Sequence, residues 1–133
     1  MTPGNEPRFL TREIVEAIHE EQIGTYGGLD GIRDENALES AVVAAENVYY
    51  YGRGDLYDVA AAYAFHLAES QAYFDGNKRT GVQAAVVFLE ANGVDTDRLQ
   101  AWPTYEIMIK IASHAAGRND LARYFRAELG SDG

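Results

Sequence analysis

Apolar residues recur at spacings of three and four along most of the chain, which is the period of an amphipathic α-helix. Thr11 is a suitable N-cap for a first helix, and Gly27 and Gly28 are typical residues for its end. A second helix is predicted to begin after Asp34. The apolar stripe of the first helix consists of Ile14, Val15, Ile18 and Ile23, and that of the second of Leu38, Ala41, Val42 and Ala45.

The middle of the chain contains β-prone residues followed by a strongly apolar segment. Near 48–56 these residues surround a Gly-Arg-Gly turn, so the stretch is either a short hairpin or an irregular loop. A third helix is expected over about 57–70, where the density of Ala, Val, Phe and Leu predicts burial on most sides. This helix is therefore expected at the centre of the fold.

Three further helices complete the pattern. The fourth is predicted from about Asn77 to a left-handed C-cap at Asn92 and Gly93. Pro103 fits the first turn of a fifth helix, and Asn119 is expected to cap a sixth. The fifth is predicted to end before Gly117 with Tyr105, Met108, Ile109 and Ala112 facing inward, and the sixth to carry Leu121, Tyr124, Phe125 and Leu129. The fold class predicted is all-α, with about six helices.

Length and composition predict a single domain over 1–133. The chain has 133 residues, of which 47% are hydrophobic and 24% charged, enough to form a hydrophobic core. No internal repeat or linker interrupts it. The ends, 1–7 and 130–133, are expected to fray.

Charge and cysteine content narrow the classes of function. The net charge is −10, whereas nucleic-acid backbones select basic surfaces, so no direct nucleic-acid partner is expected. No apolar run approaches the roughly 18 residues of a membrane span, and the start MTPGNEPRFL lacks the pattern of a secretion signal. With no cysteine to indicate an oxidising compartment, the chain is predicted to be cytoplasmic and not membrane-bound.

The run from Asp75 to Arg79 is the strongest candidate for a site. It lies where a fourth helix begins, and helix N-termini accept anions because their first N–H groups have no internal partner. Gly76 lets the backbone approach a ligand, Lys78 and Arg79 add positive charge, and Asp75 is an oxygen ligand of the kind that Mg²⁺ takes beside nucleotide phosphates. These residues predict a phosphate site for a nucleotide.

An interhelical turn without function is the alternative interpretation of this run. Asp75, Gly76 and Asn77 are ordinary turn and capping residues, and Lys78 and Arg79 would then form a solvated first turn. However, cations in the first turn oppose the helix dipole by about 0.3–1 kcal/mol each. Local stability therefore favours the phosphate interpretation.

The run from Phe74 to Thr80, with AFHLAES before it and FLEANG after it, resembles the Fic/Doc family, and specifically its death-on-curing (Doc) branch. The similarity extends over nearly the whole chain and implies the compact helical Fic fold. It also implies that ATP is the nucleotide, that Asp75 helps to hold Mg²⁺, and that amides around Gly76 and Asn77 cradle phosphates together with Lys78 and Arg79. Lys78 matches Doc proteins, in which the terminal phosphoryl of ATP is transferred to a threonine of translation elongation factor Tu.

The first position of the family motif differs in this chain. Gln71 stands where the family has the histidine that takes the proton of the attacking hydroxyl, and a glutamine amide can orient a hydroxyl but has no useful basicity. Tyr73 replaces the phenylalanine of the third position. His66 should face elsewhere, because it lies about 7 Å along the same helix and roughly 140° around it. His19 and His114 are expected to be structural or exposed.

Two further features follow from the resemblance. Tyr49, Tyr50, Tyr51 and Arg53 correspond in position to the flap with which family members hold a target segment, although a packed loop is an equally simple explanation. Family members also carry an inhibitory segment, which only the stretch from Thr2 approaches here. The resemblance therefore implies that a separate antitoxin chain acts in trans.

Three functions remain open at this stage. The first is a Doc-like toxin that phosphorylates a protein target, attenuated or retuned by Gln71. The second is a catalytically silent relative that binds a nucleotide or an antitoxin. The third is transfer of AMP to a protein hydroxyl, which Lys78 makes less favourable.

Overall fold

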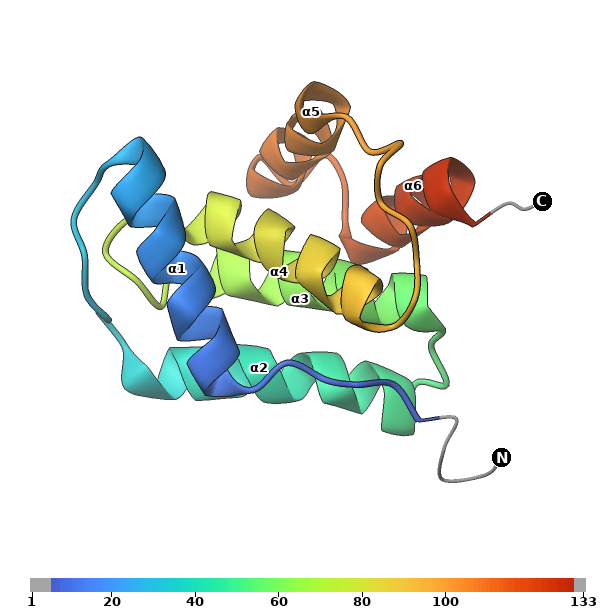
Figure 1. The fold of residues 1–133 in the computed structure, drawn as a ribbon, viewed down its shortest axis with the longest axis horizontal. Helices are drawn as coiled ribbons and strands as arrows, with labels where there is room; N and C mark the ends of the chain where they lie inside the picture. The colour runs from blue at the N-terminus through green and yellow to red at the C-terminus, as the bar shows by residue number, and fades with distance from the viewer. Residues whose placement is uncertain (1–5, 131–133) are drawn as a thin grey trace.

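The computed structural model of the chain describes residues 6–130, and these residues form six helices without a strand. An isolated antiparallel bridge joins Ile32 to Tyr73. The all-α prediction is confirmed (Figure 1). The helices are α1 (Arg12–Tyr26), α2 (Glu35–Tyr50), α3 (Leu56–Ser70), α4 (Asn77–Ala91), α5 (Ala101–Ala112) and α6 (Arg118–Leu129).

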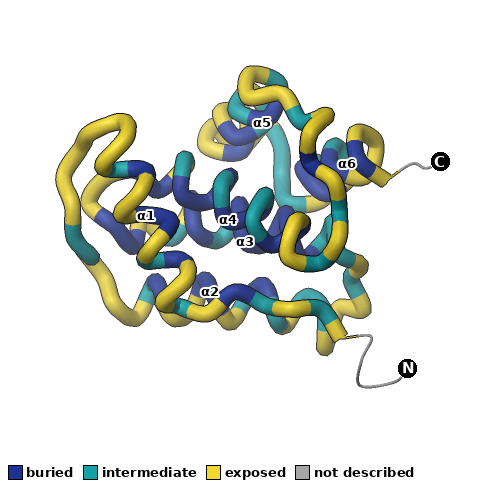
Figure 2. The backbone as a smooth tube through the Cα atoms, in the orientation of Figure 1, coloured by how far each residue is buried: buried dark blue, intermediate teal, exposed yellow. Residues whose placement is uncertain are grey.

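Helix α3 lies at the centre of the bundle, as its composition predicted. It packs against α4, α2 and α6, while α1 crosses α4 (Figure 1). Figure 2 shows buried segments along α3 and α4 beneath the more exposed α1. Gly81 permits the close approach of α3 and α4, because a Cβ atom at this position would lie 2.6 Å from the carbonyl oxygen of Ala64.

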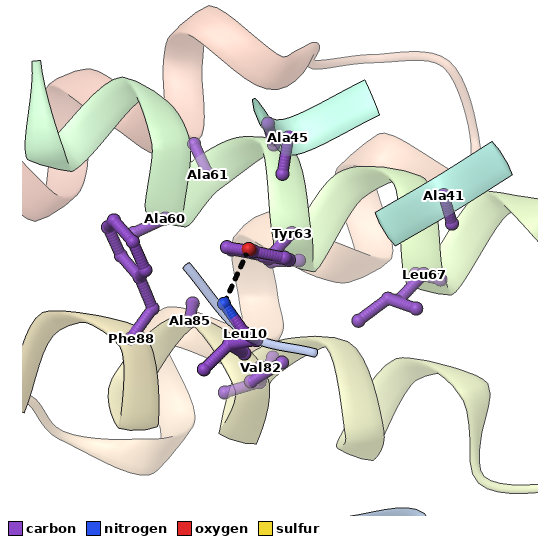
Figure 3. Close-up of a cluster of buried hydrophobic side chains, with 14 of the residues drawn as sticks. Leu10, Ala41, Ala45, Ala60, Ala61, Tyr63, Leu67, Val82, Ala85 and Phe88 are labelled. Atoms are coloured by element: carbon purple, nitrogen blue, oxygen red, sulfur yellow. Dashed lines mark hydrogen bonds between the residues drawn. The ribbon is translucent and has the colours of Figure 1, made fainter. Parts of the chain in front are cut away.

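A buried hydrogen bond ties the N-terminal segment to this core. The main-chain N–H of Leu10 donates to the hydroxyl of Tyr63 over 2.8 Å, within a cluster that includes Phe88 (Figure 3). Burial raises the pKa of Tyr63, so its hydroxyl stays protonated. The hydrogen bond therefore fixes where the chain enters α1.

The starts of α1 and α2 agree with the capping residues expected. Thr11 accepts a hydrogen bond from the N–H of Ile14, and Asp34 accepts one from the N–H of Ala37. Helix α1 ends before Gly27, whose φ of 85° suits glycine. Ile14, expected on the apolar stripe, is instead 40% exposed.

The predictions for α5 and α6 were wrong in detail. The N-cap of α6 is Gly117, because the carboxylate of Asp120 reaches back to its N–H over 2.7 Å, and Asn119 lies inside the helix. On α5, Met108 is buried whereas Ile109 is 50% exposed. Ala112, also predicted to face inward, is exposed, and Ile111 is buried in its place.

The stretch near 48–56 is an irregular loop and not a hairpin. Helix α2 continues through Tyr50, and the turn that follows is closed by the N–H of Gly54, which donates to the carbonyl of Val48. Helical packing of α2 on α3 thus overrides the β propensity of the tyrosines. The ends expected to fray lie largely outside the described residues. No helix in the described part is long and apolar enough to cross a membrane.

Candidate active site

The loop 71–76 joins α3 to α4 and has an unusual backbone. Gln71 adopts the left-handed conformation with φ of 53° and ψ of 37°, and Gly76, the N-cap of α4, has φ of 79°. A Cβ atom at Gly76 would also lie 3.3 Å from Ile23. No side chain caps the first N–H groups of α4. The first N–H groups of α4 are therefore not satisfied by a capping side chain.

The side chain of Asn77 holds this loop through two hydrogen bonds to the main chain of Tyr73. Its amide nitrogen donates to the carbonyl of Tyr73 over 2.9 Å, and its amide oxygen accepts from the N–H of Tyr73 over 3.0 Å. Asn77 is buried. Both ends of its side-chain amide are thus used by the protein, which leaves its main-chain N–H as the group that can face a ligand.

A second loop, 27–34, lies against the motif and was not anticipated from the sequence. The N–H groups of Arg33 and Asp34 donate to the carbonyl of Ala72 over 2.7 and 3.0 Å. The N–H of Leu29 donates to Oδ2 of Asp75 over 2.7 Å. The sequence feature that could have indicated this contact is the high density of glycines in loop 27–34, because glycine permits a close approach of two backbones.

Arg33 also fixes the main chain at the motif's first position. Its Nε and Nη2 atoms donate to the carbonyl of Gln71 over 2.8 and 2.5 Å. The side-chain amide of Gln71 donates to the carbonyl of Ala68 over 3.2 Å. The backbone of residue 71 is therefore held by contacts that do not depend on its side chain.

The predicted motif residues line one cavity of about 620 Å³. We call it the motif cavity; Tyr26 and Tyr105 form part of its wall. Lys78 is exposed, and neither a hydrogen bond nor an ion pair links its side chain to another described residue. The motif residues in the lining are Gln71, Asp75, Gly76, Asn77, Lys78 and Arg79.

Arg79 is partly satisfied within this cavity. Its Nη2 donates to the carbonyl of Gly27 over 3.2 Å, and its guanidinium lies 5.2 Å from the ring centre of Tyr26. Its Nε is buried and has no hydrogen-bond partner among the described residues. Arg79 is thus positioned by the protein at the wall of the cavity.

The predicted docking residues lie elsewhere. Tyr49 and Tyr50 belong to α2 and pack against Phe9, with ring centres 5.8 and 5.6 Å apart. Tyr51 is 84% exposed, and Arg53 lines a separate cavity of about 550 Å³. These residues sit where α3 begins and the motif where it ends, and fifteen helical residues span about 22 Å (Figure 1). None of them lines the motif cavity.

The histidines take structural positions. His66 lines the same cavity as Arg53. Burial lowers the pKa of His66, and the positive charge of Arg118 lowers it further. His114 is exposed in the turn after α5. His19 is buried, and its Nε2 lies 2.8 Å from the main-chain oxygen of Asp75.

The potential for metal binding in the motif cavity rests on one carboxylate. Asp75 is the acidic residue in its lining. Among residues 6–130, no group of three or more histidine or acidic side chains is placed to hold a metal ion. A cation here would need ligands from a bound molecule as well as from the protein.

Comparisons with known proteins show the family of the chain. The model of the Fic/DOC family matches residues 9–89. The chain is 35% identical over 88 residues to "Protein kinase doc" of Escherichia phage P1, covering 65% of this chain and 70% of that protein. It is 35% identical over 107 residues to "Toxin Doc" of Mycolicibacterium smegmatis, covering 73% and 77%. The chain therefore belongs to the Fic/DOC family, in its Doc branch.

Proposed function

We propose that this chain is a Doc-type toxin that transfers the terminal phosphoryl group of ATP to a hydroxyl of a protein target. The observation that carries the proposal is the motif cavity, where Lys78 and Arg79 stand beside the uncapped N-terminus of α4. Phosphoryl transfer depends mainly on positioning and on neutralising phosphate charge, and this cavity supplies both. The relative named a protein kinase supports the same class of reaction.

The cavity fits a polyphosphate. Lys78 and Arg79 both line the cavity, and the side chain of Lys78 is unpaired among the described residues. Phosphate oxygens would satisfy both, together with the main-chain N–H groups at the start of α4. The side chains of Lys78 and Arg79 thus favour an anionic ligand over a neutral one.

Asp75 fits a role in holding Mg²⁺ together with the nucleotide. Its Oδ2 accepts from Leu29, which leaves Oδ1 free to face the cavity. Magnesium sites at nucleotides commonly use one or two carboxylates plus phosphate oxygens and water. When bound, the ion would neutralise charge on the phosphates.

Gln71 limits the rate in this proposal. The target hydroxyl attacks the terminal phosphorus, the bond to the ADP oxygen breaks, and the hydroxyl proton passes to solvent. The side-chain oxygen of Gln71 can orient the hydroxyl but cannot take its proton, so the step lacks a general base worth about 10²–10⁴ in rate. The reaction is therefore expected to be slow.

The partners in this proposal are proteins of the cytoplasm. By resemblance, the target is a threonine of elongation factor Tu, and an antitoxin chain acts in trans. The flap role of Tyr49, Tyr50, Tyr51 and Arg53 stays a prediction, and their distance from the motif cavity means that they would contact a target segment remote from the reacting hydroxyl.

The test compares the native chain with Gln71→His. Each is incubated with elongation factor Tu and with ATP labelled at either the γ or the α phosphate, and label on the target is followed. We expect γ label from both proteins, with the variant faster by about 10²–10⁴. Label from α-ATP would indicate AMP transfer, and no label from either protein would refute a kinase activity on this target.

A second candidate function is a catalytically silent binder of nucleotide or antitoxin. The observation favouring it is Gln71 itself, since the cavity is otherwise complete. It predicts γ label only from Gln71→His. In either case Arg79→Ala should weaken ATP binding measured by calorimetry, and unchanged binding would exclude the motif cavity as the phosphate site.

A further inference from the structure

The guanidinium of Arg79 is held by groups of α1 that carry no charge. Its Nη2 donates to the main-chain oxygen of Gly27 over 3.2 Å, and its Cζ lies 5.2 Å from the ring centre of Tyr26. Tyr26 is the last residue of α1, and Gly27 is the C-cap of that helix. The end of α1 therefore holds a cation that belongs to the first turn of α4.

Three other arginines of the chain are paired in a different way. Arg12, Arg123 and Arg126 each lie within ion-pair distance of at least one carboxylate. No ion pair links Arg79 to an acidic residue of the described chain, although Asp75 lines the same cavity and the net charge is −10. Arg79 is therefore held in place while its positive charge is left without a neutralising partner.

The contact with α1 also offsets an electrostatic cost at the start of α4. A cation in the first turn opposes the dipole of its own helix, whereas the C-terminus of a helix attracts cations. Helix α1 has no basic residue in its last turn. Arg79 supplies a cation there from a distant part of the sequence, so its position is stabilised without a carboxylate.

Tyr26 contributes its ring to this arrangement and not its hydroxyl. The hydroxyl makes no hydrogen bond with another residue of the part described, 6–130. The residue is 65% exposed and lies outside the hydrophobic core, but it lines the motif cavity. The ring of Tyr26 is thus placed at the cavity wall beside Arg79 and not to fill the interior.

Holding Arg79 before a ligand arrives affects the free energy of binding. An arginine side chain has many rotamers, and ordering it when a ligand binds costs free energy. Lys78 is the contrast in the same cavity, because its exposed side chain has no partner among the described residues. The motif cavity therefore combines one cation that is already positioned with one that is free to move.

We propose that Tyr26 is a positioning residue for Arg79. Its ring, together with the carbonyl of Gly27, holds the guanidinium ready for a phosphate group before the nucleotide binds. This inference rests on the proposed function, because it assigns phosphate binding to Arg79. Tyr26 itself contacts neither the phosphates nor the base, and its effect on the ligand passes through Arg79.

The test is calorimetric titration of the full chain with ATP and, separately, with inorganic tripolyphosphate at fixed Mg²⁺ and ionic strength. We expect Tyr26→Leu to weaken the binding of both by about 2- to 12-fold, because the ligand must then order Arg79 itself. Tyr26→Phe keeps the ring and should retain the native affinity. In an Arg79→Ala background, titrated at millimolar ligand, Tyr26→Leu should cause no further loss.

The matched control removes a second cation–π contact. The guanidinium of Arg126 lies 5.9 Å from the ring centre of Tyr57, outside the motif cavity, so Tyr57→Leu should leave both affinities unchanged. Circular dichroism checks that each variant is folded. A loss for ATP alone would show that Tyr26 contacts the nucleoside, and a full loss in the Arg79→Ala background would show that it acts independently of Arg79. Either result, an unchanged affinity in Tyr26→Leu, or an equal loss in Tyr26→Phe or Tyr57→Leu would overturn the proposal.

Failure of this inference is distinguishable from failure of the proposed function. If ATP binds and Arg79→Ala weakens that binding but Tyr26→Leu does not, Tyr26 has no positioning role and the proposed function stands. If the native chain binds neither ATP nor tripolyphosphate, the proposed function fails and this inference fails with it.

Discussion

Removing the side chain of Asn77 should loosen the motif loop although that side chain faces the protein. The amide of Asn77 holds both the N–H and the carbonyl of Tyr73, over 3.0 and 2.9 Å. Both residues are buried, so little water can replace the lost amide. In Asn77→Ala, two main-chain groups of one residue lose their partner together.

The expected cost follows from these two groups. A buried donor or acceptor left unsatisfied costs about 1–3 kcal/mol, and neighbouring losses are not fully additive, so we expect about 2–4 kcal/mol for Asn77→Ala. Domains of this size have a free energy of unfolding of about 5–15 kcal/mol. The variant should therefore still fold, with clearly reduced stability.

Urea unfolding followed by far-UV circular dichroism measures this difference. The matched control is Asn47→Ala, because Asn47 is exposed on α2 and its side chain makes no hydrogen bond with another described residue. The control should change stability by less than about 0.5 kcal/mol. A loss below about 1 kcal/mol in Asn77→Ala would refute the reasoning, because loop 27–34 would then suffice to hold the motif.

Three further substitutions test the packing and the surface charge. Gly81→Ala brings a Cβ atom to 2.6 Å from the carbonyl oxygen of Ala64 and should lower the free energy of unfolding by about 1–3 kcal/mol. At Gly24 an added Cβ atom meets no atom within 4 Å, so Gly24→Ala should raise the free energy of unfolding by about 0.5–1 kcal/mol. Urea unfolding compares the two variants. Burial opposes ionisation of Asp55, but hydrogen bonds from a main-chain N–H and from Arg126 outweigh it and hold the pKa of Asp55 below its ordinary value. That contribution is present at neutral pH and lost as pH falls through the folded-state pKa, so Arg126→Ala should destabilise more at about pH 7 than at about pH 2, and equal losses would contradict the pairing.

Local signals in the sequence were sufficient for most helix boundaries and for the motif. Thr11 and Asp34 cap helices because each needs only an N–H a few residues later. Asn119 failed as a cap because the carboxylate of Asp120 satisfies Gly117 instead, a choice that depends on side-chain reach. The run from Asp75 to Arg79 was recognisable because its chemistry is contiguous in sequence.

Contacts between distant segments were not predictable in this way. Loop 27–34 pairs with the motif although both α2 and α3 separate them in the sequence, and no periodicity in either segment specifies that pairing. The flap prediction for Tyr49 to Arg53 used sequence position alone, and the course of α3 places these residues at its opposite end.

The scaffold of the candidate active site does not depend on the side chain at position 71. Residue 71 is held by its carbonyl through Arg33, and the neighbouring Ala72 is held by loop 27–34, so neither contact uses the side chain of Gln71. A φ of 53° is also tolerated better by histidine than by most residues. Gln71→His should therefore enter a preformed backbone without loss of stability, and any change in phosphotransfer would report the base and not a rearranged cradle.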